Sequence, residues 1–314
     1  MGTRRLGDSG LTVSVVGLGC NSFGTRMDED AVVEVVSAAL DSGIFFVDTA
    51  DTYGSVPGQS EELLGRALGG RRDDVIVATK FGNSMKGVNG PDFNARGSRR
   101  YIANAVEASL RRLRTDRIDL LQMHNPDQLT PIEETLSALD DMVHAGKVRY
   151  IGSSNFAAWQ VVDANWTAKT GGSRFISAQN GFSLLNRAAE AELVPALVRF
   201  GVGLLPYFPL EHGLLTGKYR EGQPPPPGSR LGREEYQRVL ARADWTRIEA
   251  VRGFAQARDL SMVDVAIGWL LAHSVVGSVI AGATTAEQVR ANARAGAWQP
   301  TVEEAAELDD ISSL

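Results

Sequence analysis

The sequence has few of the residues that build disulfide frameworks, metal centres or membrane anchors. Its single cysteine, Cys20, excludes an intramolecular disulfide and fits a reducing compartment. We expect no metal site, because no metal-ligand spacing connects His124, His144, His212 and His273. No apolar run approaches the ~20 residues of a membrane-spanning helix, and the N-terminus lacks the apolar core of a secretory signal. These absences predict a cytoplasmic protein with no membrane partner.

Neither sign of charge dominates the chain. Its 314 residues include 38 acidic and 32 basic side chains, which gives a formal net charge of −6, and 43% of the residues are hydrophobic. This composition is typical of a folded globular protein. The densest basic cluster is Arg111, Arg112, Arg114 and Arg117, which we interpret as the solvated face of a helix. We therefore predict no nucleic-acid partner.

Short apolar runs alternate with amphipathic stretches from one end of the sequence to the other. This alternation is typical of parallel βα units. The eight runs are Val15–Leu18, Phe45–Val47, Val75–Ala78, Ile118–Met123, Val148–Gly152, Phe175–Ala178, Val202–Pro206 and Val275–Ala281. No segment between them resembles a linker. The pattern predicts an α/β fold, a (β/α)8 TIM barrel, as one domain over residues 1–314.

Local signals predict several helix boundaries. Asp28 is a candidate N-cap for a helix that ends at Gly43. Residues 130–133 (TPIE) combine a capping box with proline at the first helical position, and Gly146 closes that helix. Residues 301–304 (TVEE) form a second capping box. These signals place helices between the predicted strands.

Two segments depart from the alternation. Residues 4–6 and 11–13 flank Asp8-Ser9-Gly10 and predict a β-hairpin before the first barrel strand, which could close the bottom of the barrel. Residues 211–243, which contain Pro224–Pro227, are too long for an ordinary loop after the seventh strand. We expect this long loop to be a functional flap.

Titratable side chains stand at the ends of three consecutive apolar runs. Asp48, Lys80 and His124 follow the second, third and fourth runs, and Tyr53 follows Asp48 by five residues. Because barrel strands open with their carboxyl ends on one face, we expect these side chains to meet. A tyrosine has an ordinary pKa of about 10, and a neighbouring ammonium lowers that pKa. We expect Asp48 to hold Lys80 charged and Lys80 to tune Tyr53. His124 would hydrogen-bond the oxygen of a bound carbonyl, so the group predicts a proton donor for carbonyl reduction.

Four stretches carry a family resemblance. They are residues 43–54 (GIFFVDTADTYG), 60–65 (SEELLG), 78–80 (ATK) and 124–127 (HNPD). With these stretches the sequence resembles the aldo/keto reductase superfamily over essentially its whole length, in the branch of bacterial reductases and potassium-channel β subunits. The resemblance implies an NADPH-dependent barrel enzyme in which Asp48, Tyr53, Lys80 and His124 form the catalytic tetrad.

The resemblance also implies a nicotinamide cofactor site in the second half of the chain. Ser154, Asn155 and Gln179 would bind the carboxamide, and Tyr207 would stack on the nicotinamide ring. The loop over the pyrophosphate would contribute Leu210, Gly213, Leu215, Gly217, Lys218 and Arg230. The adenosine phosphate would lie on Gly282, Thr284, Gln288 and Asn292, at a helix N-terminus where backbone amides favour anions. We expect NADPH, with NADH as the alternative because this last group is uncharged.

Several of these residues have a plainer interpretation. Asn155 and Thr285 could be helix N-caps, with Gln288 completing a capping box. A strand-end Asp, Lys or His could belong to a structural ion pair. Residues 17–22 (GLGCNS) could be a dinucleotide-binding fingerprint, but its third position is serine and no helix signal precedes Asp28. We interpret Asp51 and Asp127 as structural.

The sequence also predicts the character of the substrate pocket. Asn21, Phe23, Phe81 and Phe208 would line an aromatic, mostly apolar pocket suited to aromatic or small reactive aldehydes and to quinones. The same residues would catalyse alcohol oxidation in the reverse direction. A candidate from another class is a nicotinamide-sensing regulatory subunit with slow turnover, as in the channel β subunits. About fifteen residues precede the first barrel strand, so we expect no N-terminal inactivating extension. The oligomeric state stays open.

Overall fold

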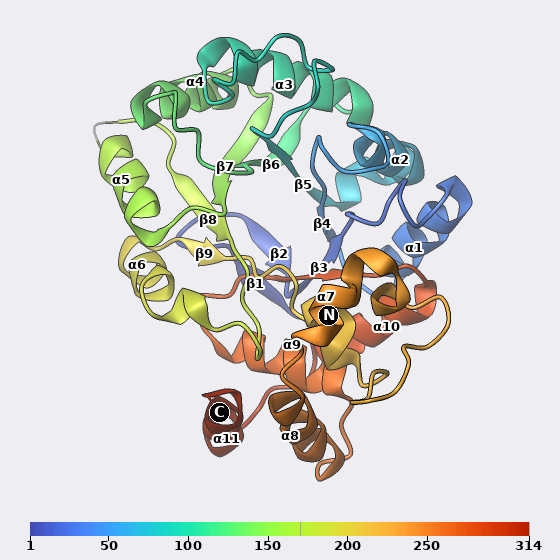
Figure 1. Cartoon of the computed structure of the whole chain (residues 1–314). Helices are drawn as coiled ribbons and strands as arrows, with labels where there is room; N and C mark the ends of the chain where they lie inside the picture. Colours follow the sequence, from blue (N-terminus) through green and yellow to red (C-terminus); the bar gives the residue numbers. More distant parts are fainter. Residues whose placement is uncertain (170, 314) are drawn as a thin grey trace.

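Eight parallel strands form one curled sheet, and helices surround it as a ring (Figure 1). The structure is a computed structural model that describes residues 1–169 and 171–313, so positions 170 and 314 of the predicted domain lie outside the described residues. The strand order is β10-β3-β4-β5-β6-β7-β8-β9. The strands are β3 (Val16–Gly19), β4 (Phe46–Asp48), β5 (Ile76–Phe81), β6 (Ile118–Met123), β7 (Val148–Ser154), β8 (Phe175–Gln179), β9 (Gly203–Leu204) and β10 (Val279–Gly282).

The sheet closes on itself beside β9. Leu204 forms a parallel bridge with Val276, in the segment that leads into β10. The Leu204 N–H donates to the Val275 carbonyl at 2.7 Å, and the Gly277 N–H donates back to the Leu204 carbonyl at 2.9 Å. Each predicted apolar run overlaps one strand, and the predicted (β/α)8 barrel is confirmed.

Helices connect the strands and cover the outer face of the sheet. They are α1 (Glu29–Asp41), α2 (Gln59–Leu68), α3 (Arg99–Leu113), α4 (Ile132–His144), α5 (Ala158–Ala168), α6 (Leu193–Phe200), α7 (Gln237–Ala241), α8 (Trp245–Gln256), α9 (Met262–Ala272), α10 (Ala286–Ala295) and α11 (Val302–Ser313). Short 3₁₀ turns are η1 (Gly69–Asp74), η2 (Ala188–Glu190), η3 (Glu211–Thr216), η4 (Arg230–Gly232) and η5 (Glu234–Tyr236).

Two predicted helix starts are confirmed. The Asp28 carboxylate accepts a hydrogen bond from the Ala31 N–H at 3.0 Å, which makes Asp28 the N-cap of α1. Before α11, the Thr301 N–H donates to Glu304 Oε2 at 2.9 Å, and the Glu304 N–H donates to Thr301 Oγ1 at 3.2 Å. These bonds satisfy N–H groups that the first helical turn leaves unbonded.

The predicted capping box before α4 is wrong. Pro131 occupies the N-cap position, one residue later than expected, and it has no side-chain hydrogen bond to the helix. The Thr130 hydroxyl instead donates to Asp127 Oδ2 at 2.7 Å. Asp127 also accepts the Gly97 and Leu129 N–H groups, as its structural interpretation predicts. Thr130 therefore stabilises the loop after β6 rather than the helix.

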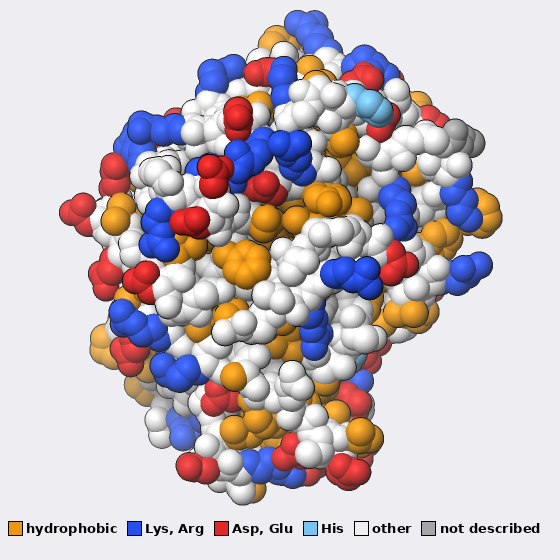
Figure 2. All heavy atoms as spheres, turned by 180° about the vertical axis from the view of Figure 1, so that it is seen from behind, with side chains coloured by type: hydrophobic (Ala, Val, Ile, Leu, Met, Phe, Trp, Pro, Cys, Tyr) orange, Lys and Arg blue, Asp and Glu red, His pale blue; other side chains and the backbone are white. Residues whose placement is uncertain are grey.

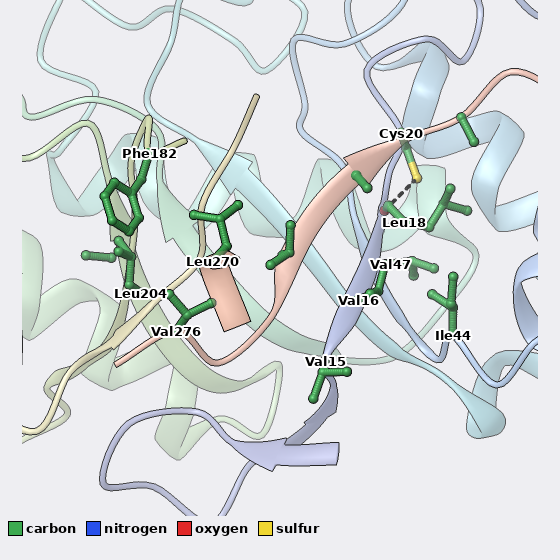
Figure 3. Packing of buried hydrophobic residues seen from close by; sticks show 14 of the residues in the cluster. Val15, Val16, Leu18, Cys20, Ile44, Val47, Phe182, Leu204, Leu270 and Val276 are labelled. Carbon is green, nitrogen blue, oxygen red and sulfur yellow. Dashed lines mark hydrogen bonds between the residues drawn. The ribbon is translucent and has the colours of Figure 1, made fainter. Parts of the chain in front are cut away.

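The larger part of the hydrophobic core lies between the sheet and the helices. Figure 3 shows Leu18 of β3 beside the buried Cys20, with Val47 of β4 next to Leu18 and Val16 farther toward the start of β3. A smaller cluster fills the barrel itself and consists of Leu6, Leu11, Val13, Phe46, Ala78, Leu120, Ile176, Leu205 and Ile280. Because strands covered on both faces are apolar on both faces, they read in the sequence as continuous apolar runs.

The predicted hairpin is confirmed as β1 (Thr3–Arg5) paired with β2 (Thr12–Ser14). Its connecting residues place Leu6 in the cluster inside the barrel, where the side chain has no exposed surface. Burial of such a leucine stabilises the fold by about 1.5–3 kcal/mol. The Arg4 guanidinium donates to the carbonyls of Leu271 at 2.6 Å and Val276 at 3.0 Å. The hairpin therefore closes the amino end of the barrel and leaves the carboxyl end for a ligand.

The outer surface carries no large region of one charge on the face shown in Figure 2, where basic and acidic side chains are interspersed. Among residues 1–169 and 171–313, no helix is long and apolar enough to cross a membrane. The described residues also contain no group of three or more His, Cys, Asp or Glu side chains that could hold a metal ion.

Candidate active site

A cavity of ≈ 470 Å³ opens at the carboxyl ends of the barrel strands. Most residues predicted for the site line it. They are Asn21, Asp48, Tyr53, His124, Ser154, Asn155, Gln179, Tyr207, Phe208, Leu210, Gly213, Lys218, Arg230, Gly282, Thr284, Gln288 and Asn292. The long loop after β9 forms one wall through η3 and Arg230. This volume is within the range of small-molecule and cofactor sites.

Asp48, Lys80 and Tyr53 meet at the floor of the cavity. Asp48 ends β4, and Lys80 lies near the end of β5, the neighbouring strand. The Lys80 ammonium lies 2.6 Å from Asp48 Oδ2 and 2.9 Å from the Thr49 carbonyl. It also donates to the Tyr53 hydroxyl at 3.4 Å. Lys80 is fully buried beneath the cavity wall, so it reaches a ligand through Tyr53.

Two glutamines complete the surroundings of Asp48. Gln122 and Gln179 both donate from Nε2 to Asp48 Oδ1, at 3.0 Å and 2.8 Å. Oδ2 is thereby left to Lys80, and the buried carboxylate has a partner on each oxygen. The sequence analysis predicted Gln179 for a different role and missed Gln122. A polar side chain in the second half of β6, after Leu120 and Leu121, is the signal that could have identified Gln122.

Burial determines the protonation of Tyr53. It raises the pKa of Tyr53 above the ordinary value, and this effect exceeds the opposite effect of the Lys80 charge. The phenol therefore holds its proton at neutral pH. Burial lowers the pKa of Lys80, but Asp48 and Tyr53 raise it by more, so that the ammonium stays charged. The pair combines a protonated acid with a cation placed to stabilise the phenolate that forms when the proton leaves.

His124 follows β6 and faces Tyr53 across the cavity. The two rings meet edge to face, with centroids 5.8 Å apart. Burial, followed by the charge of Lys80, lowers the pKa of His124 to about 3. The imidazole is therefore neutral at neutral pH. Its Nδ1 is buried and has no hydrogen-bond partner among the described residues. A neutral imidazole can donate one hydrogen bond to a polar group in the cavity.

Polar side chains after β7 and β8 form the opposite wall. Asn155 has a left-handed backbone, with φ of 60°, and donates from Nδ2 to the His124 carbonyl at 2.9 Å. Its Oδ1 accepts the Tyr207 hydroxyl at 2.8 Å, which fixes the Tyr207 ring beside the cavity. The Ser154 hydroxyl donates to the Gln179 carbonyl. Asn155 is not a helix cap, because α5 begins after Ala157.

The start of α10 forms the far end of the cavity. Thr285 is the N-cap of α10, because its hydroxyl accepts the Gln288 N–H at 3.3 Å. The Gln288 side chain does not complete the expected box with Thr285. Its Oε1 instead accepts the Thr284 N–H at 2.9 Å. The N–H of Thr284 is thus occupied, while the Thr284 and Gln288 side chains still line the cavity.

Among the described residues, three cations line the cavity, and the sequence analysis predicted two of them, Lys218 and Arg230. The third is Arg26, from the loop after β3. Its guanidinium makes no hydrogen bond or ion pair with any described residue. Burial, then the charges of Arg230 and Arg233, lower the pKa of Arg26. The Nε atom of Arg230 is likewise buried without a partner among the described residues. Cations gathered without a counter-ion form a site for an anion.

The sequence analysis missed one further cavity residue and predicted others that do not line the cavity. His212, missed entirely, lines the cavity and packs on Phe208 with ring centroids 4.2 Å apart. Phe23 and Phe81 do not line the cavity, contrary to expectation. Both are 1% exposed or less and belong to the core, because their side chains point away from the barrel mouth into the apolar layer. The predicted Leu215 and Gly217 also lie behind the lining residues, and Leu215 is fully buried.

Comparison with known proteins identifies the family. A family model described as aldo/keto reductase matches residues 15–313. The chain belongs to the aldo/keto reductase family. An uncharacterized oxidoreductase, YrpG of Bacillus subtilis (strain 168), is 38% identical over 91% of this chain and 88% of its own. A probable voltage-gated potassium channel subunit beta of Oryza sativa subsp. japonica is 34% identical over 93% of this chain and 90% of its own. L-glyceraldehyde 3-phosphate reductase of Escherichia coli (strain K12) is 34% identical over 93% of this chain and 86% of its own.

Membership of the aldo/keto reductase family supports an oxidoreductase that reduces carbonyl compounds in general. Aldo/keto reductases generally use nicotinamide cofactors. The glycine-containing turn of residues 17–22 does not act as a dinucleotide fingerprint of the doubly wound type, because α1 begins only at Glu29. In this aldo/keto reductase the turn instead contributes Gly19, Cys20, Asn21 and Ser22 to the lining of the cavity.

Proposed function

We propose that this aldo/keto reductase reduces an aldehyde or ketone to an alcohol, with NADPH as the hydride donor and Tyr53 as the general acid. One observation carries the proposal. A protonated phenol lies at the floor of a ligand-sized cavity, 3.4 Å from a buried ammonium that is paired with Asp48. This arrangement supports proton donation to a carbonyl oxygen, because Lys80 stabilises the phenolate that remains.

Each residue of the tetrad has a distinct task in this proposal. Tyr53 gives its proton to the carbonyl oxygen of the substrate. Lys80 holds the phenolate charge, and Asp48 keeps Lys80 charged in a buried position. His124 donates a hydrogen bond to the same carbonyl oxygen and orients it, since its low pKa keeps the ring neutral. A reduced nicotinamide supplies the hydride when it is bound.

The polar and cationic lining of the cavity supports a phosphorylated dinucleotide as the ligand. Ser154, Asn155 and Gln179 would hold the carboxamide, with Tyr207 against the nicotinamide ring. The phosphates would lie on Lys218, Arg230 and Arg26. Among the described cavity residues the one carboxylate is Asp48, which is already paired with Lys80, so these three cations are available to an anion. The unpartnered Nε of Arg230 supports this assignment. The excess of cations favours NADPH over NADH.

The substrate side of the cavity is aromatic and apolar. Phe208, Pro209 and Ile280 line it together with the polar Asn21. Such a surface favours aromatic or small reactive aldehydes and quinones. Phe208 is 37% exposed, which leaves its ring available to pack against a substrate.

The decisive experiment is the loss of NADPH absorbance when purified protein meets an activated aromatic aldehyde. Tyr53→Phe retains the ring beside His124 and removes only the hydroxyl. We expect this variant to lose about 10²–10⁴-fold in kcat, the usual size of general acid catalysis. Its dissociation constant for NADPH should stay near that of the wild type. Wild-type turnover by Tyr53→Phe would show that another group donates the proton.

The cofactor preference has a separate test. Dissociation constants for NADPH and NADH are measured by titration of protein fluorescence. Arg26→Gln should weaken NADPH binding by about tenfold, the size expected for one hydrogen bond to a charged group. Equal affinities of the wild type for NADPH and NADH would refute the preference for NADPH.

A nicotinamide-sensing subunit is the second candidate, because a probable potassium channel subunit beta is 34% identical over 93% of the chain. The same assay distinguishes the two. Multiple turnovers that depend on Tyr53 support the reductase. A single slow turnover, followed by retention of the oxidised cofactor, supports the sensor.

A further inference from the structure

Behind Tyr53 and Lys80 lies a buried set of polar side chains that the proposed mechanism does not use. We refer to it as the buried polar ring, which consists of Asp51, Glu61, Thr79, Asn89 and Arg112. Four of its members are at most 5% exposed, and the Arg112 side chain is 10% exposed. They come from five different segments of the chain. Polar groups buried in this way are costly unless they are hydrogen-bonded.

Hydrogen bonds connect the members in sequence. Glu61 of α2 accepts from Thr79 Oγ1 at 2.5 Å and from Arg112 Nε at 2.6 Å. Arg112 of α3 then donates to Asn89 Oδ1 at 3.1 Å. Asn89, in the loop after β5, donates from Nδ2 to Asp51 Oδ2 at 3.2 Å. The chain of contacts runs from β5 through two helices and back to the loop that carries Tyr53.

Both ends of this chain of contacts meet at the tetrad. Thr79 directly precedes Lys80 on β5. The Asp51 N–H donates to the Lys80 carbonyl at 3.1 Å, which closes the ring through the backbone. The Tyr53 N–H bonds to the Ala50 carbonyl at 3.2 Å, within the same turn. A shift of Asp51 therefore moves Tyr53 relative to Lys80.

A glycine makes room for the ring. Gly58 has a φ of 90°, and its N–H donates to the Asp51 carbonyl at 2.6 Å. A Cβ atom at Gly58 would lie 2.5 Å from Arg112 Cδ. The Tyr53 loop is thus built closely around the Arg112 side chain.

The ring contains two carboxyl groups and one guanidinium. Arg112 forms its ion pair with Glu61, at 2.6 Å. Burial, then the charge of Glu61, raises the pKa of Asp51 well above the ordinary value of its carboxyl, against the smaller effect of Arg112. Oδ1 of Asp51 has no hydrogen-bond partner among the described residues. A neutral amide of the same shape can therefore replace this carboxyl.

We propose that the buried polar ring positions the Tyr53 hydroxyl against the Lys80 ammonium, with Asp51 and Asn89 as positioning residues that touch neither substrate nor cofactor. The inference rests on the proposed role of Tyr53 as general acid. The distance between the two groups is 3.4 Å, at the long end of hydrogen bonding, so a further displacement breaks the contact. The ring connects α2 and α3 to the loop that carries Tyr53, so the packing of these helices determines where the Tyr53 hydroxyl lies.

The test compares three variants with one matched control. Asn89→Ala and Asp51→Ala remove links of the ring, and Asp51→Asn keeps the shape of a neutral carboxyl. We expect both alanine variants to lose about 10- to 100-fold in kcat, because a misplacement near 1 Å costs about 10²-fold. Their dissociation constants for NADPH should stay within about twofold of the wild type, and Asp51→Asn should restore most of kcat. The control, Asp92→Asn, breaks an ion pair to Arg96 in the same loop and should leave kcat unchanged.

A second measurement does not need turnover. Hydrogen exchange of the segment 50–60 should be faster in Asn89→Ala than in the wild type or Asp92→Asn, because the Tyr53 loop loses its anchor. Unchanged exchange, or a wild-type kcat in Asn89→Ala, would overturn the proposal. Equal loss of kcat in Asp51→Asn and Asp51→Ala would also overturn it, because a neutral side chain of the same shape would then not preserve the ring.

If the wild type reduces no aldehyde, the proposed function fails, while faster exchange still supports the ring. If Asp51→Ala does not fold, Asn89→Ala carries the test.

Discussion

Lys80→Met tests how strongly the tetrad depends on its buried charges. The Lys80 and Asp48 side chains are 0% and 3% exposed, and their charged atoms are 2.6 Å apart. Methionine fills a similar volume but leaves Asp48 with two glutamine amides and no cation. Breaking a buried pair from one side typically costs about 3–5 kcal/mol, because an uncompensated charge remains. We expect a loss of this size in the free energy of unfolding.

The double variant Lys80→Met/Asp48→Asn identifies the cause of that loss. The new side-chain amide would keep an oxygen for Gln122 and Gln179, while no charge remains. A buried pair replaced by neutral groups is often close to neutral in stability. The double variant should therefore be more stable than Lys80→Met alone, although it has two changes instead of one. Both should be inactive, since Tyr53 has lost its cation.

Urea unfolding followed by circular dichroism measures these free energies. If Lys80→Met costs less than about 1 kcal/mol, or if the two changes are additive, the two charges do not act as one buried ion pair.

Three further variants and one control, Val56→Ala, probe other parts of the fold. Leu6→Ala should cost about 2–5 kcal/mol in urea unfolding, because it opens a cavity inside the barrel, whereas the 59% exposed Val56→Ala should change stability by less than about 0.5 kcal/mol. The pKa of His124 is lowered from 6.5 to about 3, so the unfolded chain binds a proton that the folded protein does not, and stability falls as the pH drops from 6.5 toward 3. His124→Gln should flatten this acid-side slope, and an equal slope would contradict a buried neutral imidazole. Gly58→Ala should lower the melting temperature, because its Cβ meets Arg112 and its φ is left-handed; an unchanged melting temperature would show that the loop relaxes freely.

The sequence predicted those parts of the site that topology alone brings together. Asp48, Lys80 and His124 lie at strand ends, and parallel strands of a barrel present their ends on one face. Their placement needs only the strand order. The hairpin is similar, because a turn signal between two short runs fixes its pairing.

The errors have a common physical origin. A sequence shows that Phe23 and Phe81 are apolar and near the mouth, but it does not show which way the side chains point. Arg112 was interpreted as part of a solvated helix face, yet its side chain reaches into the buried polar ring. The sequence does not reveal this contact, because the partner Glu61 is 51 positions away. Arg111 and Arg114 are exposed as expected. Arg26 was missed for a similar reason, since the groups that act on its charge, among them Arg230 and Arg233, lie about 200 positions away in the sequence.

The pairing of β3 with β10 has a consequence for how the chain is made. Val16 of β3 pairs with Val279 of β10, which emerges from the ribosome about 260 residues later. At 5–20 residues per second, this interval is on the order of tens of seconds. Throughout it, one edge of β3 lacks its partner and is open to other nascent chains. The exposed edge reads Val16-Gly17-Leu18-Gly19, and its two glycines make it a poor template for foreign strands. The same glycines that let β3 pack against Phe46 and Ile280 thus lower the risk of aggregation during synthesis.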